Sequence, residues 1–350
     1  MVRLVPLPER FRYFVPAFEA GPAPLYAHLA ESAAAELAAR PRGAFRRALA
    51  PFELEPVRWF LPLRLLAAVH RWVLAGEQPE LAAHYPSAGG ALAPEGAWPR
   101  FRDAVVARAE ELPVLLASPL QHNEVTRAAA LAPGFLLVGR ETGMPLRLLE
   151  VGASAGLLLR WDHYLHSWWF PRMFDGEAPA VGGRVHVVER RGCDLSPIDA
   201  TTAAGGLLLR SYVWADLADH VRILDEAIAL TRVVPAFVDR ADGADWLEEL
   251  AHPRPGTATV VFHSLMRPSG PAESLDRMGE KLRRHAAAAM AEAPLAYLRF
   301  EAPDLDPPAG RARRLVEVRL TVWPGGEERL LATADVNGRN IRQQPALTTA

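Results

Sequence analysis

The chain has 350 residues, half of them hydrophobic, a formal net charge of -2 and one cysteine, Cys193. This length accommodates one large domain or two ordinary ones, and the nearly balanced charge argues against a nucleic-acid partner, which usually requires a basic surface. One cysteine excludes an intramolecular disulfide and a metal cluster held by several thiolates.

The N-terminal part of the chain has the pattern of a helical domain. Segments such as PLYAHLAESAAAELAARP carry apolar residues three and four positions apart and end at Pro or Gly. The last of these helices is expected to begin near QHNEVTR, with Asn123, Glu124 and Arg127 on one face. The pattern predicts an all-helical cap over residues 1–143. No signal peptide or run of ~18 apolar residues is evident, so we expect a cytoplasmic protein without a membrane partner.

Between residues 144 and 342, short apolar runs alternate with helical stretches. LRLLEV, VHVVERRGCD, VPAFVD, TATVVFHS and PLAYLRFE have the composition of strands, and helical segments separate them. This alternation predicts a mostly parallel sheet with helices on both faces. The sequence around Pro324-Gly325-Gly326 predicts a closing hairpin. We therefore expect an α/β, Rossmann-like fold of about seven strands with an antiparallel C-terminal hairpin, followed by a loose tail over 343–350.

The most informative stretch is LRLLEVGASAGLLLRWD, predicted to form a strand, a small-residue loop and a helix. Glycine in such a loop lets a ligand lie against bare backbone. Read as E-x-G-x-x-x-G, the stretch is a nucleoside-cofactor loop made by Glu150, Gly152, Ala153, Ser154 and Gly156. Read as G-x-S-x-G, it is the nucleophile elbow of a serine hydrolase centred on Ser154.

The surrounding sequence favours the cofactor loop. A hydrolase of this type needs strands before the elbow and a suitably placed histidine after it, whereas the upstream region is predicted to be helical. The spacing also departs from the G-x-G-x-x-G dinucleotide fingerprint. A carboxylate on Glu150 ~4 Å from a pyrophosphate would cost ~4 kcal/mol at an effective dielectric constant of ~20, and it would favour a cation by a similar amount. S-adenosylmethionine carries an ammonium and a sulfonium and has no phosphate.

Two further acidic positions follow the next predicted strands. Asp194, in GCDLSP, can accept hydrogen bonds from both hydroxyls of a ribose. Asp242 or Asp245, in DRADGADWL, is placed to bind an adenine amino group. Together with Glu150, these acids predict a nucleoside site at the ends of three successive strands.

These segments resemble two groups of proteins. EVGASAG, GCDLSP and ADGADW are similar to motifs of the class I S-adenosylmethionine-dependent methyltransferases, although Ser154 replaces the usual middle glycine. HNEVTR, LLEVGASAGLLL, SYVWAD and LTVWPGG resemble an uncharacterised bacterial family, a domain of unknown function. The first resemblance implies S-adenosylmethionine as cofactor and methyl transfer to a small molecule. Non-catalytic binding of the nucleoside is the alternative.

Candidate catalytic residues are less well defined. His263 ends the fourth predicted strand and has a side chain suited to general-base catalysis near neutral pH, and Glu124 and Glu301 are weaker candidates. The residues expected to line the substrate pocket or form a lid over it are His122, Asn123 and Arg127. We expect no metal site, and the oligomeric state is left open.

Overall fold

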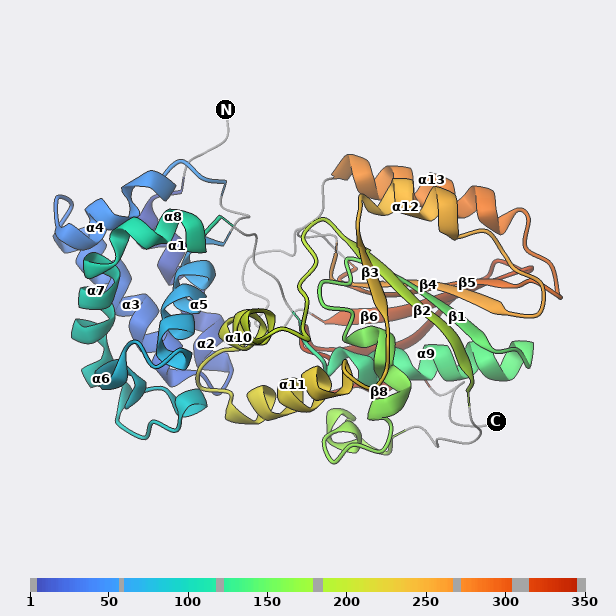
Figure 1. Ribbon diagram of the computed structural model, residues 1–350, viewed down its shortest axis with the longest axis horizontal. Coiled ribbons are helices and arrows are strands. Elements are labelled where there is room, and N and C mark those ends of the chain that lie inside the picture. Colours follow the sequence, from blue (N-terminus) through green and yellow to red (C-terminus); the bar gives the residue numbers. More distant parts are fainter. Residues whose placement is uncertain are drawn as a thin grey trace. The chain divides into compact units, whose positions relative to one another are not determined.

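The computed structural model describes residues 5–56, 60–117, 123–178, 185–266, 272–303 and 315–344 (Figure 1). The chain folds into two compact units, and each unit is built from two separate stretches of sequence. Unit 1 comprises Met1–His122 and Ala200–Glu226, and unit 2 comprises Asn123–Asp199 and Ala227–Ala350.

The described residues of unit 1 form helices and the turns that connect them, without a strand. Its apolar core includes Leu29, Leu65, Val69 and Phe101, all of them buried. The helices are α1 (Leu7–Arg12), α2 (Val15–Ala20), α3 (Pro24–Ala39), α4 (Ala44–Leu49), α5 (Leu61–Leu74), α6 (Pro79–Ala82), α7 (Ala97–Ala107), α8 (Leu112–Leu115) and α10 (Ala203–Tyr212), and α11 (Ala218–Leu230) begins in this unit.

The residues that connect α10 and α11 are not helical. The Asp216 carboxylate in this connection accepts hydrogen bonds from the amides of Leu25, at 2.8 Å, and Tyr26, at 3.3 Å. Both amides belong to the first turn of α3, where N–H groups have no partner within the helix. The connection therefore supplies a cap for a helix far away in the sequence.

Unit 2 contains one sheet of eight strands in the order β3-β2-β1-β4-β5-β6-β7-β8. Strands β1 to β5 pair in parallel and β6, β7 and β8 pair antiparallel, which confirms the expected mostly parallel sheet with antiparallel C-terminal strands. The eighth strand is only two residues long and includes Gln343, which was expected in the tail; residues 345–350 lie outside the described residues. The strands are β1 (Leu146–Val151), β2 (Val187–Asp194), β3 (Phe237–Arg240), β4 (Ala258–Ser264), β5 (Leu295–Glu301), β6 (Val316–Trp323), β7 (Glu328–Ala334) and β8 (Arg342–Gln343).

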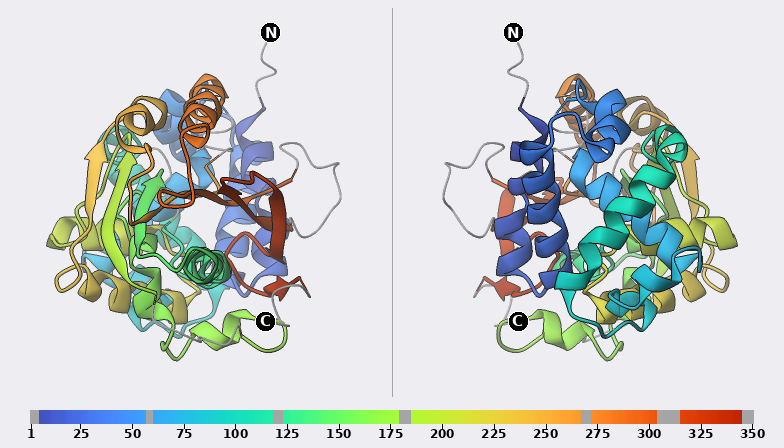
Figure 2. Two further views of the ribbon diagram at one scale, coloured as in Figure 1. Left: turned by 90° about the vertical axis from the view of Figure 1, so that its right-hand side faces the viewer. Right: turned by 90° about the vertical axis from the view of Figure 1, so that its left-hand side faces the viewer.

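Helices cover both faces of this sheet, with α9 (Arg127–Thr142) on one face and α12 (Gly243–Leu250) and α13 (Ala272–Ala286) on the other (Figures 1 and 2). Because side chains alternate along a strand, Leu149 and Val151 enter the core beneath α12 and α13, and Glu150 faces the other way. Phe262, which lies beside Glu150 in the register, packs edge to face on Phe135 of α9 with ring centroids 5.0 Å apart. Glu150 therefore lies on the α9 face.

The helix expected directly after the small-residue loop is instead a short 3-10 helix, η6 (Leu158–Tyr164), with non-helical dihedral angles at Arg160. Side chains take the carbonyl groups that an α-helix would use. Arg160 donates to the Gly156 carbonyl oxygen at 2.7 Å, and the Tyr164 hydroxyl donates to the Leu157 carbonyl oxygen at 2.9 Å.

The start of α9 also differs from the expectation, since the helix begins at Arg127 and Asn123 and Glu124 precede it. A turn after β7 holds this start. Arg127 Nε donates to the Val336 carbonyl oxygen at 3.0 Å. Gly338 approaches so closely that a Cβ atom there would lie 2.6 Å from the Arg127 Cα atom.

Replacing Gly338 by alanine should therefore destabilise unit 2. Gly338 has a φ of +72°, so alanine would add backbone strain of ~1–2 kcal/mol and a collision with main-chain atoms of ~1–3 kcal/mol. Gly143→Ala is the matched control, because Gly143 has a φ of +63° and nothing within 4 Å of the added Cβ. Urea unfolding should show a larger loss of unfolding free energy for Gly338→Ala than for Gly143→Ala. Equal losses in the two variants would show that the turn accommodates the added methyl group without an energetic cost.

Candidate functional site

The candidate site lies at the carboxyl ends of the parallel strands, around the end of β1. The strands that flank β1 are β2 on one side and β4 on the other, so the chain order reverses between β1 and β4. Ligands of open α/β sheets bind at such a reversal. Glu150, the loop 152–156 and Asp194 are all found there.

The backbone of the small-residue loop is tied to the end of β2. The amides of Gly152 and Ala153 both donate to the Cys193 carbonyl oxygen, at 2.9 and 3.0 Å. The Ser154 amide donates to Asp194 Oδ2 at 2.9 Å. The N–H groups in the first half of the loop are therefore all hydrogen-bonded to other parts of the protein.

The second half of the loop is satisfied in the same way. The Ala155 amide donates to Asn123 Oδ1 at 3.4 Å, and the Gly156 amide donates to the Ala153 carbonyl oxygen at 2.6 Å. Every N–H group between 152 and 156 thus has a protein partner. An anion-binding loop presents such groups to its ligand, so this loop is unsuited to holding a phosphate.

Ser154 lies in the left-handed region of backbone conformation, which favours glycine. Its φ is +49°, between Gly152 at +72° and Gly156 at +65°. A residue with a Cβ pays a strain of ~1–2 kcal/mol in this region. The Ser154 hydroxyl accepts a hydrogen bond from Asn123 Nδ2 at 2.9 Å, a contact that glycine would lack.

Glu150 is the most unusual group at this edge. Its side chain is 2% exposed, and its Oε2 atom has no hydrogen-bond partner among the described residues. Burial, and secondarily the charge of Asp194, raises the pKa of Glu150 well above its usual value, although Arg160 opposes the shift. A buried carboxyl in this state binds either a proton or another cation.

Asp194 lies beside the loop and is partly exposed. Besides the Ser154 amide, it accepts a hydrogen bond from the Ser196 amide to Oδ1 at 2.8 Å. Each carboxylate oxygen has two lone pairs, so both oxygens retain the capacity to accept from a ligand.

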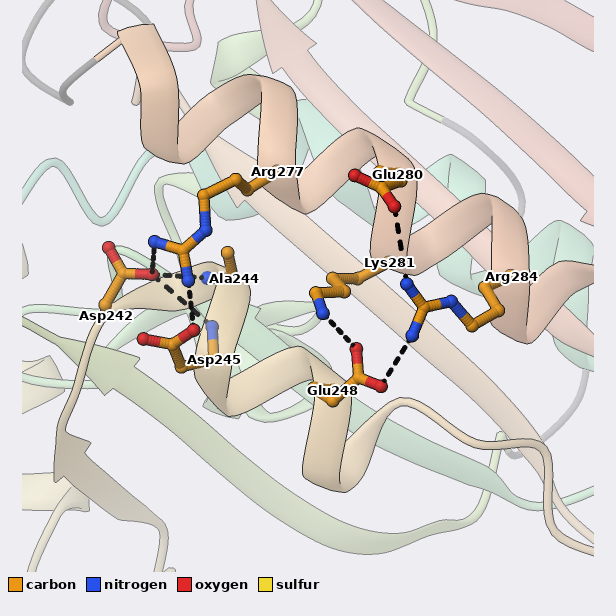
Figure 3. Close-up of polar contacts among 8 residues, drawn as sticks. All are labelled: Asp242, Ala244, Asp245, Glu248, Arg277, Glu280, Lys281 and Arg284. Atoms are coloured by element: carbon orange, nitrogen blue, oxygen red, sulfur yellow. Dashed lines mark hydrogen bonds and ion pairs between the residues drawn. The ribbon is translucent and has the colours of Figure 1, made fainter.

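Asp242 and Asp245 are engaged elsewhere, in the contact between α12 and α13 (Figure 3). Asp242 caps α12 by accepting from the Ala244 amide at 3.0 Å, and its other oxygen accepts from the Ser274 hydroxyl at 2.7 Å. Partial burial raises the pKa of Asp242, but these hydrogen bonds outweigh it and leave the pKa lowered. Asp245 pairs with Arg277. These carboxylates are thus not joined to Glu150 and Asp194.

His263 lies on the sheet face opposite Glu150, together with Val261 and Tyr297. It is buried; its Nδ1 atom lies 2.9 Å from Glu301 Oε1 and its Nε2 atom 2.7 Å from the Tyr297 hydroxyl. Both ring nitrogens of His263 therefore have hydrogen-bond partners. This arrangement occurs in structural histidines as well as in histidines that act as general bases.

The remaining predicted residues surround the start of α9. Arg127 is buried and donates to the Ser264 hydroxyl at 3.3 Å. Burial lowers the pKa of Arg127, and the nearby charges of Glu124, Glu301 and Asp335 oppose this. Asn123 contacts the loop as described above, and His122 lies outside the described residues.

Sequence reasoning missed Met266, just beyond β4. Its amide donates to Glu301 Oε1 at 2.6 Å, and its side chain lies where it would touch a Cβ atom at Gly152, at 3.5 Å. Leu265, beside it, has a φ of +48°. No local pattern in the sequence marks this strained turn, so only the fold reveals that Met266 covers the loop.

A hollow of about 520 Å³ lies at the opposite end of β5, lined by Glu141, Pro294, Trp323 and Arg329 among others. It is remote from the carboxyl ends of the parallel strands. No cluster of potential metal ligands occurs within the described ranges.

The mostly parallel sheet, the loop after β1 and the acids beside it define an α/β protein with a candidate ligand site at its carboxyl edge. The chain belongs to the family described as "Uncharacterized protein conserved in bacteria" (DUF2332), whose model matches residues 8–343. This confirms the expected membership of an uncharacterised bacterial family. No curated protein matches the chain. None of the described helices has both the length and the apolar character needed to cross a membrane.

The buried carboxyl predicts a distinctive pH dependence of stability. Because its pKa is raised on folding, the stability associated with Glu150 is present at low pH. It is lost as the pH rises from the ordinary glutamate value, about 4.3, through the raised value. Glu150→Gln removes this ionisation, so the variant should gain stability relative to the wild type as the pH rises. Urea unfolding between pH 4 and pH 8 measures the difference.

Glu248→Gln is the control for this measurement. Glu248 is partly exposed, and its hydrogen bond with Lys281 lowers its pKa, so the variant should show only a weak trend of opposite sign. If the difference between Glu150→Gln and the wild type does not change with pH, the carboxyl is not perturbed by its surroundings.

Proposed function

We propose that unit 2 binds S-adenosylmethionine at the carboxyl edge of its sheet and transfers the methyl group to a small molecule. The observation that carries the proposal is the buried Glu150 carboxyl, whose Oε2 atom has no partner among the described residues. It lies next to a loop whose N–H groups are all bonded to the protein.

The charges at this edge favour a cationic ligand. Glu150 and Asp194 are neighbouring carboxyls, and Arg160, whose charge acts on Glu150, directs its Nε and Nη1 atoms to carbonyl oxygens of Val234 and Gly156. The ammonium group of S-adenosylmethionine fits Glu150, and the remaining lone pairs of Asp194 fit the ribose hydroxyls. A phosphate-bearing cofactor would meet the Asp194 carboxylate, a buried carboxyl that offers no positive charge, and no available loop amide.

The topology supports the same ligand class. The order β3-β2-β1-β4-β5 supports the expected Rossmann-like, doubly wound sheet, in which a nucleoside would lie across the end of β1. The cofactor would bring its own reactive methyl group, so the protein has mainly to position the acceptor. Because Met266 covers Gly152, its flexible side chain has to swing aside when the ligand binds.

Binding without catalysis is a second candidate function, favoured by the state of His263. Its two ring nitrogens are already engaged by Glu301 and Tyr297, on the face of the sheet opposite Glu150. The serine-hydrolase alternative receives less support, because it needs a histidine that is able to take a proton from Ser154.

Isothermal titration with S-adenosylhomocysteine, which keeps the ammonium and the ribose, tests the binding proposal. Glu150→Gln and Asp194→Asn each weaken a charge-assisted contact worth ~1.5–3 kcal/mol, so each should lower affinity roughly 10- to 100-fold. Asp175→Asn is the matched control, because Asp175 is exposed and pairs with Arg342; its affinity should equal that of the wild type.

Saturable binding that is lost in both site variants and kept in the control supports the proposal. No binding to the wild type, or equal binding by all four proteins, overturns it. Methyl turnover from labelled S-adenosylmethionine with a panel of small nucleophiles then separates catalysis from binding alone. Labelling of Ser154 by a fluorophosphonate would favour the hydrolase instead.

A further inference from the structure

Three side chains of β4 and β5 form a continuous hydrogen-bonded chain. His263 Nδ1 lies 2.9 Å from Glu301 Oε1, and His263 Nε2 lies 2.7 Å from the Tyr297 hydroxyl. The two strands pair in parallel, and the three side chains lie on the sheet face opposite Glu150. The proposed cofactor site therefore does not use them.

The carboxylate determines which ring nitrogen carries the proton. A carboxylate only accepts hydrogen bonds, so His263 Nδ1 donates to Glu301 and Nε2 presents its lone pair to the Tyr297 hydroxyl, which donates to it. The Met266 amide also donates to Glu301 Oε1, at 2.6 Å, and holds the carboxylate in place. Acid, imidazole and hydroxyl thus follow one another in the order of an acid–base–nucleophile relay.

Burial gives this relay an inner and an outer end. Glu301 is 6% exposed and His263 is 2% exposed, whereas Tyr297 is partly exposed. Tyr297 is therefore the member that a molecule from solvent can reach. A phenol with the ordinary pKa of ~10 is protonated at neutral pH, so it attacks an electrophile only when a base takes its proton. His263 Nε2 is placed to be that base.

The charged side chains around Tyr297 favour an uncharged electrophile. The Arg299 guanidinium carbon lies 5.4 Å from the centroid of the Tyr297 ring, and Arg299 pairs with Glu328. On the neighbouring strand β6, Arg319 pairs with Glu317 at 2.6 Å and with Glu328 at 3.0 Å. These two cations and two acids balance, so they offer no surplus positive charge to a phosphate. Arg299 is still close enough to stabilise negative charge that develops on a carbonyl oxygen under attack.

We propose that Tyr297 is the nucleophile of a second reactive site, which takes an acyl group from an activated carboxylic ester. The Tyr297 oxygen attacks the carbonyl carbon, and its proton moves to His263 Nε2. Glu301 acts as a positioning residue, because its carboxylate holds Nδ1–H and balances the charge of the imidazolium. When the tetrahedral intermediate collapses, the bond to the leaving alcohol breaks and the alcohol takes the proton from Nε2. The products are an acyl ester of Tyr297 and the free alcohol.

Acetylation of the full chain by 4-nitrophenyl acetate tests this proposal. The wild type should release nitrophenolate in a burst of about one equivalent per chain. After an acid quench at the end of the burst, peptide mass spectrometry should find the acetyl group on Tyr297. Tyr13 is the internal control, because it is 62% exposed and its ring packs edge to face on that of Phe14. It should be acetylated much more slowly despite its greater exposure.

Variants distinguish a reactive relay from a structural one. Tyr297→Phe removes only the hydroxyl and should abolish the burst. His263→Gln cannot take the proton, so it should lower the ratio of the acetylation rates at Tyr297 and Tyr13 roughly 100-fold. Glu301→Ala should lower this ratio as well, and Glu301→Gln, whose amide oxygen can still accept from Nδ1, should restore part of it. A merely structural role would change the free energy of unfolding without changing the ratio.

The wild-type measurement can overturn the proposal without any variant. Equal acetylation rates at Tyr297 and Tyr13 would refute it, and so would acetylation of Ser154 in place of Tyr297. In the variants, an unchanged ratio in folded His263→Gln would show that the histidine is not the base.

Discussion

The pairing of the loop 152–156 with the end of β2 determines the candidate site. The Cys193 carbonyl and the Asp194 carboxylate together take three consecutive N–H groups of this loop. Gly192 permits the close approach, since a Cβ atom there would lie only 2.6 Å from that of Ala153. Because these contacts fix the turn without help from Glu150, the buried carboxyl remains available for a proton or a cation.

The available carboxyl of Glu150 distinguishes the proposed site from a phosphate-binding loop in a sheet with the same strand order. A phosphate loop presents unsatisfied N–H groups, and its glycines allow the anion to approach them. Here the N–H groups of the loop are bonded to the protein, and the acidic side chains of Glu150 and Asp194 lie beside it. The selectivity of the site for cations would then arise because a positively charged ligand competes with a proton for Glu150. Burial disfavours an isolated carboxylate at this position, so Glu150 binds one or the other.

Regular periodicity explains what the sequence could predict. The apolar run of β1, the hairpin around Pro324 and the change from helices to a mostly parallel sheet follow from local composition, and the structure contains them. The departures occur where side chains bind groups that no periodic pattern identifies. Arg160 and Tyr164 bind the carbonyl oxygens of Gly156 and Leu157 just before η6, Asp216 caps α3, and Asp242 caps α12 and binds Ser274. A local pattern identifies an acid at a strand end, but it does not reveal which donor that acid meets.

The assembly of unit 1 from two distant stretches has a practical meaning for dissecting this protein. A fragment that stops where the strands begin omits Asp216, and with it the cap of α3; it also omits Ser211, whose carbonyl contacts the buried His70. Such a piece would expose an unfinished interior and be prone to aggregate. The helical unit is therefore not a simple terminal segment of the chain, because its second stretch lies within the sequence of the sheet unit.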